Sequence, residues 1–288
     1  MLSGLAQFQV SRLTGFLRGW RGLGRFWTIT GGLFAALLAS LQLAGPPPAA
    51  IGAAPAPLIA HRSKPTGPVR PRVALLVGGI GLSLADSVAA IDHLPPAVSF
   101  AVMPGSGNLD RVLPMIRRRG HEYLLSIPME PRRFPLDDPD SATALMTTLA
   151  DGENAARLRT ILGSVSGYVG VTNVLGPLKG ESLMSAPDLF GAVQKEIAGR
   201  GLFFLEAGTQ PLAAKGRQAD AVLDDDPVNS ATLDARLDAL THIALDKGAA
   251  VGIITLPRPV TLERAAAWSR GLDAKGVDLV PVGTLASF

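Results

Sequence analysis

The chain has 288 residues, of which 47% are hydrophobic and none is cysteine. This composition supports a substantial core and excludes a disordered chain, a disulfide framework, a thiolate metal site and a cysteine nucleophile. Residues 1–70 hold seven of the 27 Lys and Arg and none of the 24 Asp and Glu, so residues 71–288 carry a net charge of −4 and we expect no nucleic-acid partner.

The N-terminal arm has the order of a membrane anchor. Residues 1–25 contain four arginines, residues 26–44 are an uncharged apolar run, and residues 45–71 are rich in Pro and Ala. Such a run is long enough to cross a bilayer, and the preceding arginines favour a cytoplasmic N-terminus. We therefore expect a basic cytoplasmic segment (1–25), a transmembrane anchor in the inner membrane (26–44), an extended linker (45–71) and a periplasmic domain (72–288). A cleaved signal peptide is the alternative.

From residue 72 onward, short apolar runs alternate with helical patterns about eight times. Near-continuous apolar strands indicate a parallel sheet that is buried on both faces. The pattern predicts an α/β fold, with a (β/α) barrel, complete or incomplete, favoured over a doubly wound sheet. The expected strands are 73–77, 98–102, 123–127, 168–171, 202–205, 221–223, 250–254 and 278–282.

Helix boundaries are predicted from capping residues. Gly120 and Gly201 each follow a helical pattern and suit a left-handed cap. His121, beside the first of these glycines, is expected to be a capping or surface histidine. The expected helix starts are Ser83, Asn108, Ser185, Asn229 and Thr261.

The first strand, VALLVGGIG at 73–81, ends in two glycines where α/β folds usually present ligand-binding groups. It is not a dinucleotide-binding fingerprint, because Leu84 stands where the third glycine belongs and the next strand is not followed by an acidic residue. The four histidines of the chain have no metal-ligand spacing, so a histidine-built zinc site is not expected.

Polar residues follow several later strands: Glu130, Asn173, Glu206, Asp224 to Asp226, and Arg258. If the sheet is parallel, these side chains converge on one rim, and their mixture suits the hydroxyl groups of a sugar. Two simpler interpretations remain open. Glu130 could pair with a neighbouring arginine, and the three aspartates could form a loop that caps the next helix.

Seven ordered phrases resemble the divergent polysaccharide deacetylase family. The resemblance covers about residues 72–286 and implies a deformed (β/α) barrel, usually exported in bacteria, from a branch of the carbohydrate esterases. The phrases are VALLVGGIG, LPPAVSFAVMP, GHEYLLSIPMEP, GVTNVLGP, GLFFLEAGT, VLDDDP and GIITLPRPVTLE.

The resemblance also implies where a metal site would lie, and there this chain departs from the pattern. Gly78 and Gly79 occupy the positions of a pair of aspartates, Val174 that of a histidine, and Leu256 the start of a histidine-rich phrase. Glu206 stands where the family has an aspartate. A metal-dependent deacetylase needs such ligands to hold an ion that polarises the acetyl carbonyl and activates water. We therefore expect degenerate metal positions and no bound metal cofactor.

Three hypotheses follow. The first is a noncatalytic protein that binds or scaffolds glycan at the cell envelope. The second is an active carbohydrate deacetylase whose metal site is rebuilt from Glu130, Glu206 and Asp226. The third is a protein-partner scaffold, which an exposed apolar patch around Val174 and its neighbours would favour. The candidate substrate-binding residues are Glu130, Asn173, Thr209, Asp224, Asp226 and Arg258.

Overall fold

The computed structural model describes residues 70–208, 216–225 and 229–286. The expected cytoplasmic segment, the expected anchor and nearly all of the expected linker lie outside this range, as do Thr209 and Asp226. Within it, no helix combines the length and the apolar character that crossing a bilayer requires.

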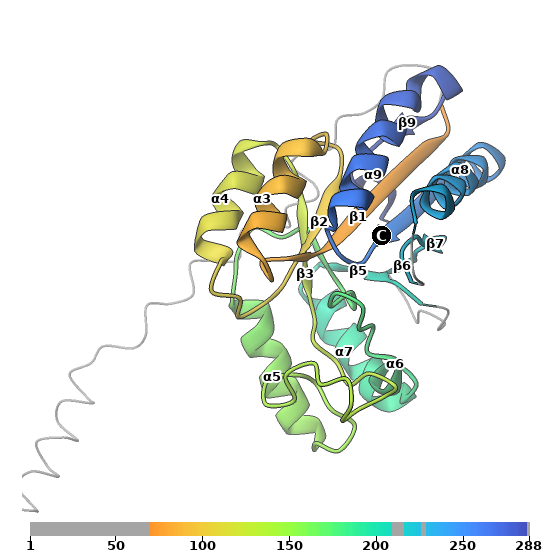
Figure 1. Cartoon of the computed structure of the whole chain (residues 1–288). Helices are drawn as coiled ribbons and strands as arrows, with labels where there is room; N and C mark the ends of the chain where they lie inside the picture. The colour runs from red at the N-terminus through yellow and green to blue at the C-terminus, as the bar shows by residue number, and fades with distance from the viewer. Residues whose placement is uncertain (1–69, 209–215, 226–228, 287–288) are drawn as a thin grey trace, which may run out of the picture. The chain divides into compact units, whose positions relative to one another are not determined.

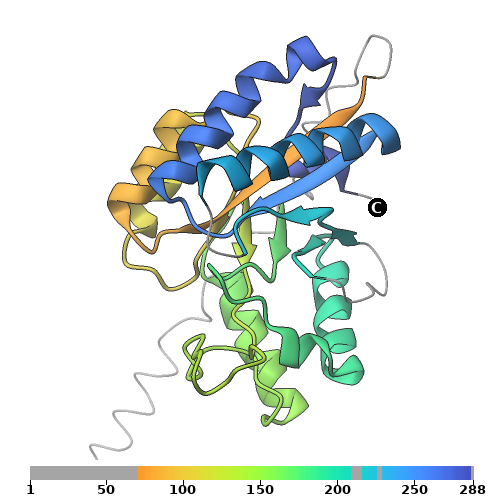
Figure 2. The same ribbon diagram turned by 45° about the vertical axis from the view of Figure 1, so that its right-hand side comes forward.

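One all-parallel sheet forms the centre of the described domain. Its hydrogen-bonded order is β6-β5-β4-β3-β2-β1-β8-β7, and β9 pairs with the start of β1. The sheet curls, as Figures 1 and 2 show, so the expected α/β class is confirmed and the barrel takes the form of a curled half-barrel. The strands are β1 (Arg72–Ile80), β2 (Ser99–Val102), β3 (Tyr123–Ser126), β4 (Gly170–Thr172), β5 (Phe203–Glu206), β6 (Gly216–Gln218), β7 (Ala221–Val222), β8 (Ala249–Ile254) and β9 (Asp278–Leu279).

The two edge strands of the sheet are consecutive in the chain, and the segment 216–222 joins one edge to the other. The backbone N–H of Ala219 donates to the carbonyl oxygen of Glu206 (2.8 Å), and that of Asp220 donates to Val251 (2.8 Å). The Asp220 carboxylate accepts a hydrogen bond from the N–H of Val251 at 2.9 Å. The last expected strand, 278–282, is shorter than predicted and pairs with the start of β1, so it does not close the barrel.

Helices cover the outer face of the sheet. In Figure 1, α3 and α9 lie alongside the long β1, while α5, α6 and α7 lie at the far end of the molecule. The helices are α3 (Leu84–His93), α4 (Leu109–Arg118), α5 (Asp151–Gly163), α6 (Glu181–Met184), α7 (Pro187–Gly199), α8 (Ser230–Lys247), α9 (Pro259–Gly271) and α10 (Val282–Leu285), with a short 3-10 turn at Asp273–Lys275.

Two of the expected N-caps are confirmed. The side chains of Ser83 and Asn229 accept the backbone N–H three residues on. Asn108 precedes α4, but its side chain donates to the loop after β1 and makes no cap. The helix start expected from Ser185, Pro187 and Asp188 is found, since α7 begins at Pro187, but Ala186 and not Ser185 takes the N-cap position. The prediction for Thr261 is wrong, because α9 begins two residues earlier, at Pro259.

His121 also departs from expectation. Its side chain is buried, Nδ1 lies 2.8 Å from the carbonyl oxygen of Val98, and its ring packs 4.6 Å from that of Phe100. Gly120 and Gly201 have the expected left-handed backbone, with φ of +79° and +71°. The capping glycine therefore lets the chain turn inward, and this brings the histidine into the core.

The barrel interior is filled with apolar side chains, and α10 contributes to it from the C-terminus. Val282 and Leu285 pack with inward-facing residues of the strands. The first turn of α10 is held by Glu122, whose carboxylate accepts the N–H of Gly283 at 2.6 Å and the hydroxyl of Ser99 at 2.8 Å. Burial raises the pKa of Glu122, and these two hydrogen bonds oppose the rise.

Candidate functional site at the carboxyl ends of the strands

The end of β1 packs against two apolar side chains, one that follows the neighbouring strand β8 and one that follows β4, three strands away in the sheet. A Cβ atom on Gly78 would lie 2.7 Å from Cγ1 of Val174 and 2.8 Å from the carbonyl oxygen of Thr255. A Cβ atom on Gly79 would lie 2.8 Å from Cδ2 of Leu256, and the φ of +72° at this glycine disfavours any side chain. We call Gly78, Gly79, Val174 and Leu256 the apolar plug.

The apolar plug does not fit a divalent ion. Its four residues carry no side-chain oxygen or nitrogen, and the space into which carboxylates at the two glycines would project is occupied by Val174 and Leu256. Elsewhere in the described ranges, no group of three or more His, Asp or Glu side chains is placed to hold a metal.

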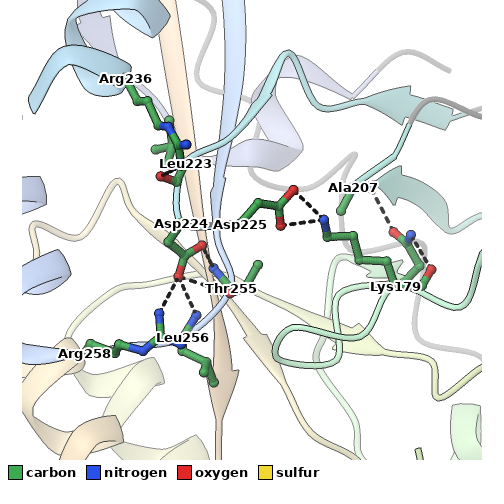
Figure 3. A network of polar contacts seen from close by, with 10 residues as sticks. Lys179, Ala207, Leu223, Asp224, Asp225, Arg236, Thr255, Leu256 and Arg258 are labelled. Carbon is green, nitrogen blue, oxygen red and sulfur yellow. Dashed lines mark hydrogen bonds and ion pairs between the residues drawn. The ribbon is translucent and has the colours of Figure 1, made fainter. Parts of the chain in front are cut away.

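Asp224, which follows β7, fixes the segment after β8. Its carboxylate accepts the N–H of Thr255 at 2.6 Å, the hydroxyl of Thr255 at 3.1 Å and the N–H of Leu256 at 3.3 Å. Arg258 lies 3.6 Å away, with about half of its side chain exposed. Figure 3 shows Arg258, Leu256 and Thr255 gathered around this carboxylate, which thereby holds Leu256 in the apolar plug.

The neighbouring aspartate faces the opposite way. Both oxygens of Asp225 accept hydrogen bonds from Nζ of Lys179, at 2.5 and 2.6 Å. Figure 3 shows the two consecutive aspartates pointing to opposite sides of the chain. The ion pair of Lys179 and Asp225 connects the loop after β4 to the loop after β7.

Asn173 and Glu206 lie at the ends of the adjacent strands β4 and β5. Asn173 donates from Nδ2 to the carbonyl oxygen of Lys179 (2.9 Å) and accepts from the N–H of Ala207 (2.9 Å). Glu206 is fully buried. Both line a cavity of about 360 Å³, and we call it the side cavity. It is lined by Arg132, Asn173, Lys179, Glu181, Met184, Glu206, Ala207, Gly208, Ala219, Asp220, Ala221, Val222 and Asp225.

Glu130 does not line the side cavity. Its carboxylate accepts the N–H and the hydroxyl of Thr147, at 2.7 and 2.8 Å. Within the described residues it makes no ion pair with Arg132 or Arg133, so that simpler interpretation is wrong. Arg133 instead lies 3.5 Å from Asp137.

The structure thus separates the residues that the sequence was expected to bring together. Asn173, Glu206 and Asp225 share the side cavity, whereas Glu130, Asp224 and Arg258 do not line it. The sequence reasoning missed Arg132, Lys179, Glu181 and Asp220 as lining residues. Only Asp220 had a usable signal, because it lies in a short polar stretch just before the apolar run that forms β7.

The chain has an all-parallel sheet that curls like a barrel, with polar side chains and a cavity at the carboxyl ends of the strands. These features place it among (β/α) proteins whose functional site lies at that end of the sheet. Residues 75–286 match the family model for divergent polysaccharide deacetylases. The chain belongs to the divergent polysaccharide deacetylase family.

Relatives of the chain include proteins with solved structures and others known from sequence. The crystal structure of uncharacterized protein ATU2773 from Agrobacterium tumefaciens C58 superposes with a TM-score of 0.73 at 31% identity, covering 80% of this chain and 95% of that one. An uncharacterized protein of Haemophilus influenzae is 24% identical over 74% of this chain and 76% of its own length. The uncharacterized protein YibQ of Escherichia coli is 25% identical over 59% of this chain, and the match spans about half (53%) of YibQ.

Proposed function

We propose that this protein is an exported carbohydrate-binding member of its family that lacks deacetylase activity. The observation that carries the proposal is the apolar plug, because it occupies the positions that the family resemblance assigns to metal ligands. In a metal-dependent deacetylase, a divalent ion held by such ligands would polarise the acetyl carbonyl and activate water. Glycine, valine and leucine supply no ligand, and the packing leaves no room for one.

The proposed setting is the cell envelope, with residues 26–44 as an anchor in the inner membrane and the barrel in the periplasm. The uncharged run and the arginines before it support this placement. The proposed partners are an envelope glycan and the membrane itself. The net charge of −4 over residues 71–288 argues against a nucleic-acid partner.

Neither alternative is favoured by a specific observation. A rebuilt carboxylate site needs Glu130 and Glu206 together, but Glu130 is held by Thr147 and does not line the cavity that contains Glu206. A protein-docking patch around the former site needs exposed apolar surface there. Val174 is fully buried, Leu175 is only 7% exposed, and Leu256 is only partly exposed.

The test is the metal content and deacetylase activity of the purified full-length chain, kept in a mild detergent. Acetate release from acetylated chitooligosaccharides would be measured with and without added Zn²⁺, Co²⁺ and Mn²⁺, and metal would be quantified by plasma mass spectrometry. We expect no turnover above buffer and no stoichiometric metal. Stoichiometric metal with turnover that Glu130→Ala and Asp226→Ala both abolish would overturn the proposal and support a rebuilt site.

A further inference from the structure

We infer that carbohydrate binds in the side cavity, beside the apolar plug and not over it, with the Lys179–Asp225 pair as its central recognition group. The inference rests on the proposed carbohydrate-binding function and adds the site and the class of sugar. The cavity volume of about 360 Å³ is near the lower end of the range of about 300–1,000 Å³ that small-ligand sites occupy. This size suits one sugar unit of a longer glycan.

The chemistry of the lining suits hydroxyl groups. Six of its side chains are charged and one is an amide. Glu206 and Asn173 are buried in the wall, and the other five offer hydrogen-bond donors and acceptors around one space. A sugar hydroxyl both donates and accepts, so it matches such a mixed surface. The larger cavity beside α5, which Pro104, Pro128, Ala142 and Ala156 help to line, offers fewer such groups.

The Lys179–Asp225 pair can offer a ligand both a hydrogen-bond donor and a hydrogen-bond acceptor. Nζ of Lys179 has three donors, and two of them are used by the carboxylate oxygens of Asp225. The Lys179 side chain is 15% exposed and that of Asp225 is 43% exposed, so the pair faces the cavity without being sealed. Among the described residues the remaining ammonium proton and the other lone pairs of the carboxylate have no further partner, so each side of the pair can bind one hydroxyl.

The walls around this pair are already held in position. Asn173 binds the carbonyl oxygen of Lys179 and the N–H of Ala207, which ties the loop after β4 to the end of β5. Asp220 is held by the N–H of Val251 and by Arg217 at 2.9 Å. A ligand therefore meets a largely preorganised surface, which lowers the ordering cost of binding.

The charges of the lining select the class of sugar. Four carboxylates (Glu181, Glu206, Asp220 and Asp225) and two cations (Arg132 and Lys179) line the side cavity. Lys179 and Asp225 engage each other, and Asp220 is paired with Arg217 at 2.9 Å. A phosphate or uronic acid group would therefore meet one further cation of the lining, Arg132, beside the carboxylates of Glu181 and Glu206. We therefore assign the site to a sugar without acidic groups, either neutral or carrying an amine.

The experiment is calorimetric titration of the full-length chain in mild detergent with three tetrasaccharides: N-acetylglucosamine, glucosamine and galacturonic acid tetramers. We expect the first or the second to bind and the third to bind at least about tenfold more weakly than the better of them. Lys179→Met and Asp225→Asn should each weaken that binding about tenfold or more, because each removes a charge-assisted contact. Lys275→Met is the matched control, since it breaks an exposed ion pair with Asp238 (2.6 Å) on α8, away from the cavity.

Binding that both cavity variants leave unchanged would overturn the site and would leave the proposed function standing. Preference for the galacturonic acid tetramer would overturn the assigned class of sugar. Absence of binding by all three tetramers to the folded chain would overturn both the site and the carbohydrate-binding part of the proposed function. The metal and acetate-release assays stay independent of these outcomes. If Lys179→Met lowers the melting temperature, the test rests on Asp225→Asn, which keeps the shape of the side chain.

Discussion

The packing of the apolar plug predicts a measurable coupling between Gly78 and Val174. The perturbation is a double-mutant cycle of Gly78→Ala and Val174→Ala. The added Cβ would lie 2.7 Å from Cγ1 of Val174, closer than such atoms approach in folded proteins, and 2.8 Å from the carbonyl oxygen of Thr255. Val174→Ala removes the first clash and leaves the second.

The expected magnitudes follow from these contacts. Gly78→Ala overpacks the site and should lower the free energy of unfolding by about 1–3 kcal/mol. Val174 is fully buried, and removing two of its carbons should cost about 2 kcal/mol once the residual cavity is included. In the double variant the new methyl group fills part of that cavity. We therefore expect a loss smaller than the sum of the single losses by about 1 kcal/mol.

The assay is urea denaturation of the full-length chain, followed by far-ultraviolet circular dichroism. The control cycle pairs Val174→Ala with Gly191→Ala, because a Cβ atom on Gly191 in α7 would have no neighbour within 4 Å. The control pair should be additive to within about 0.5 kcal/mol. If Gly78 and Val174 are equally additive, the description of the apolar plug is wrong.

Three further predictions concern buried polar groups. Asp224→Ala should lower the free energy of unfolding by about 3 kcal/mol or more, because it leaves the N–H of Thr255 without its acceptor. In the same denaturation assay, Asp225→Ala should lower it by about 1 kcal/mol or less, because Asp225 is partly exposed. The raised folded-state pKa of Glu122 means that its contribution is fully favourable below its unfolded-state pKa and is lost as pH rises through the folded-state value. Denaturation from pH 4 to 8 should therefore show a smaller decline for Glu122→Gln than for the wild type, and identical pH profiles would contradict this. Ser126→Ala should be neutral or stabilising by up to about 1 kcal/mol, because the buried hydroxyl of Ser126 has no hydrogen-bond partner in the described domain; a lower melting temperature would count against it.

Much of the sheet could be predicted because its strands are buried on both faces. VALLV and LFFL are apolar along their whole length, and YLLS is apolar up to Ser126, as strands in a parallel sheet between two layers should be. β6 was missed because its sequence, GRQ, is polar and only partly buried at a sheet edge. The left-handed glycines and the Ser83 cap were found because local backbone geometry alone determines them.

The site was harder to predict because loops bring its parts together. Strand ends pointed correctly to Asn173, Glu206 and Asp225 as lining residues. Lys179 lies in a loop whose path depends on contacts with distant segments, and no pattern in the sequence indicates that it meets Asp225. The opposite orientations of Asp224 and Asp225 are set by their partners after β8 and after β4.

The apolar plug has a consequence for the order in which substitutions could accumulate. A side chain at Gly78 requires that Val174 first become smaller, and a side chain at Gly79 requires that Leu256 move and that the residue tolerate a φ of +72°. Each reduction made alone leaves a cavity, and each addition made alone produces a clash. Any evolutionary path that adds side chains at the two glycines therefore passes through less stable intermediates, so the present packing resists such change one residue at a time.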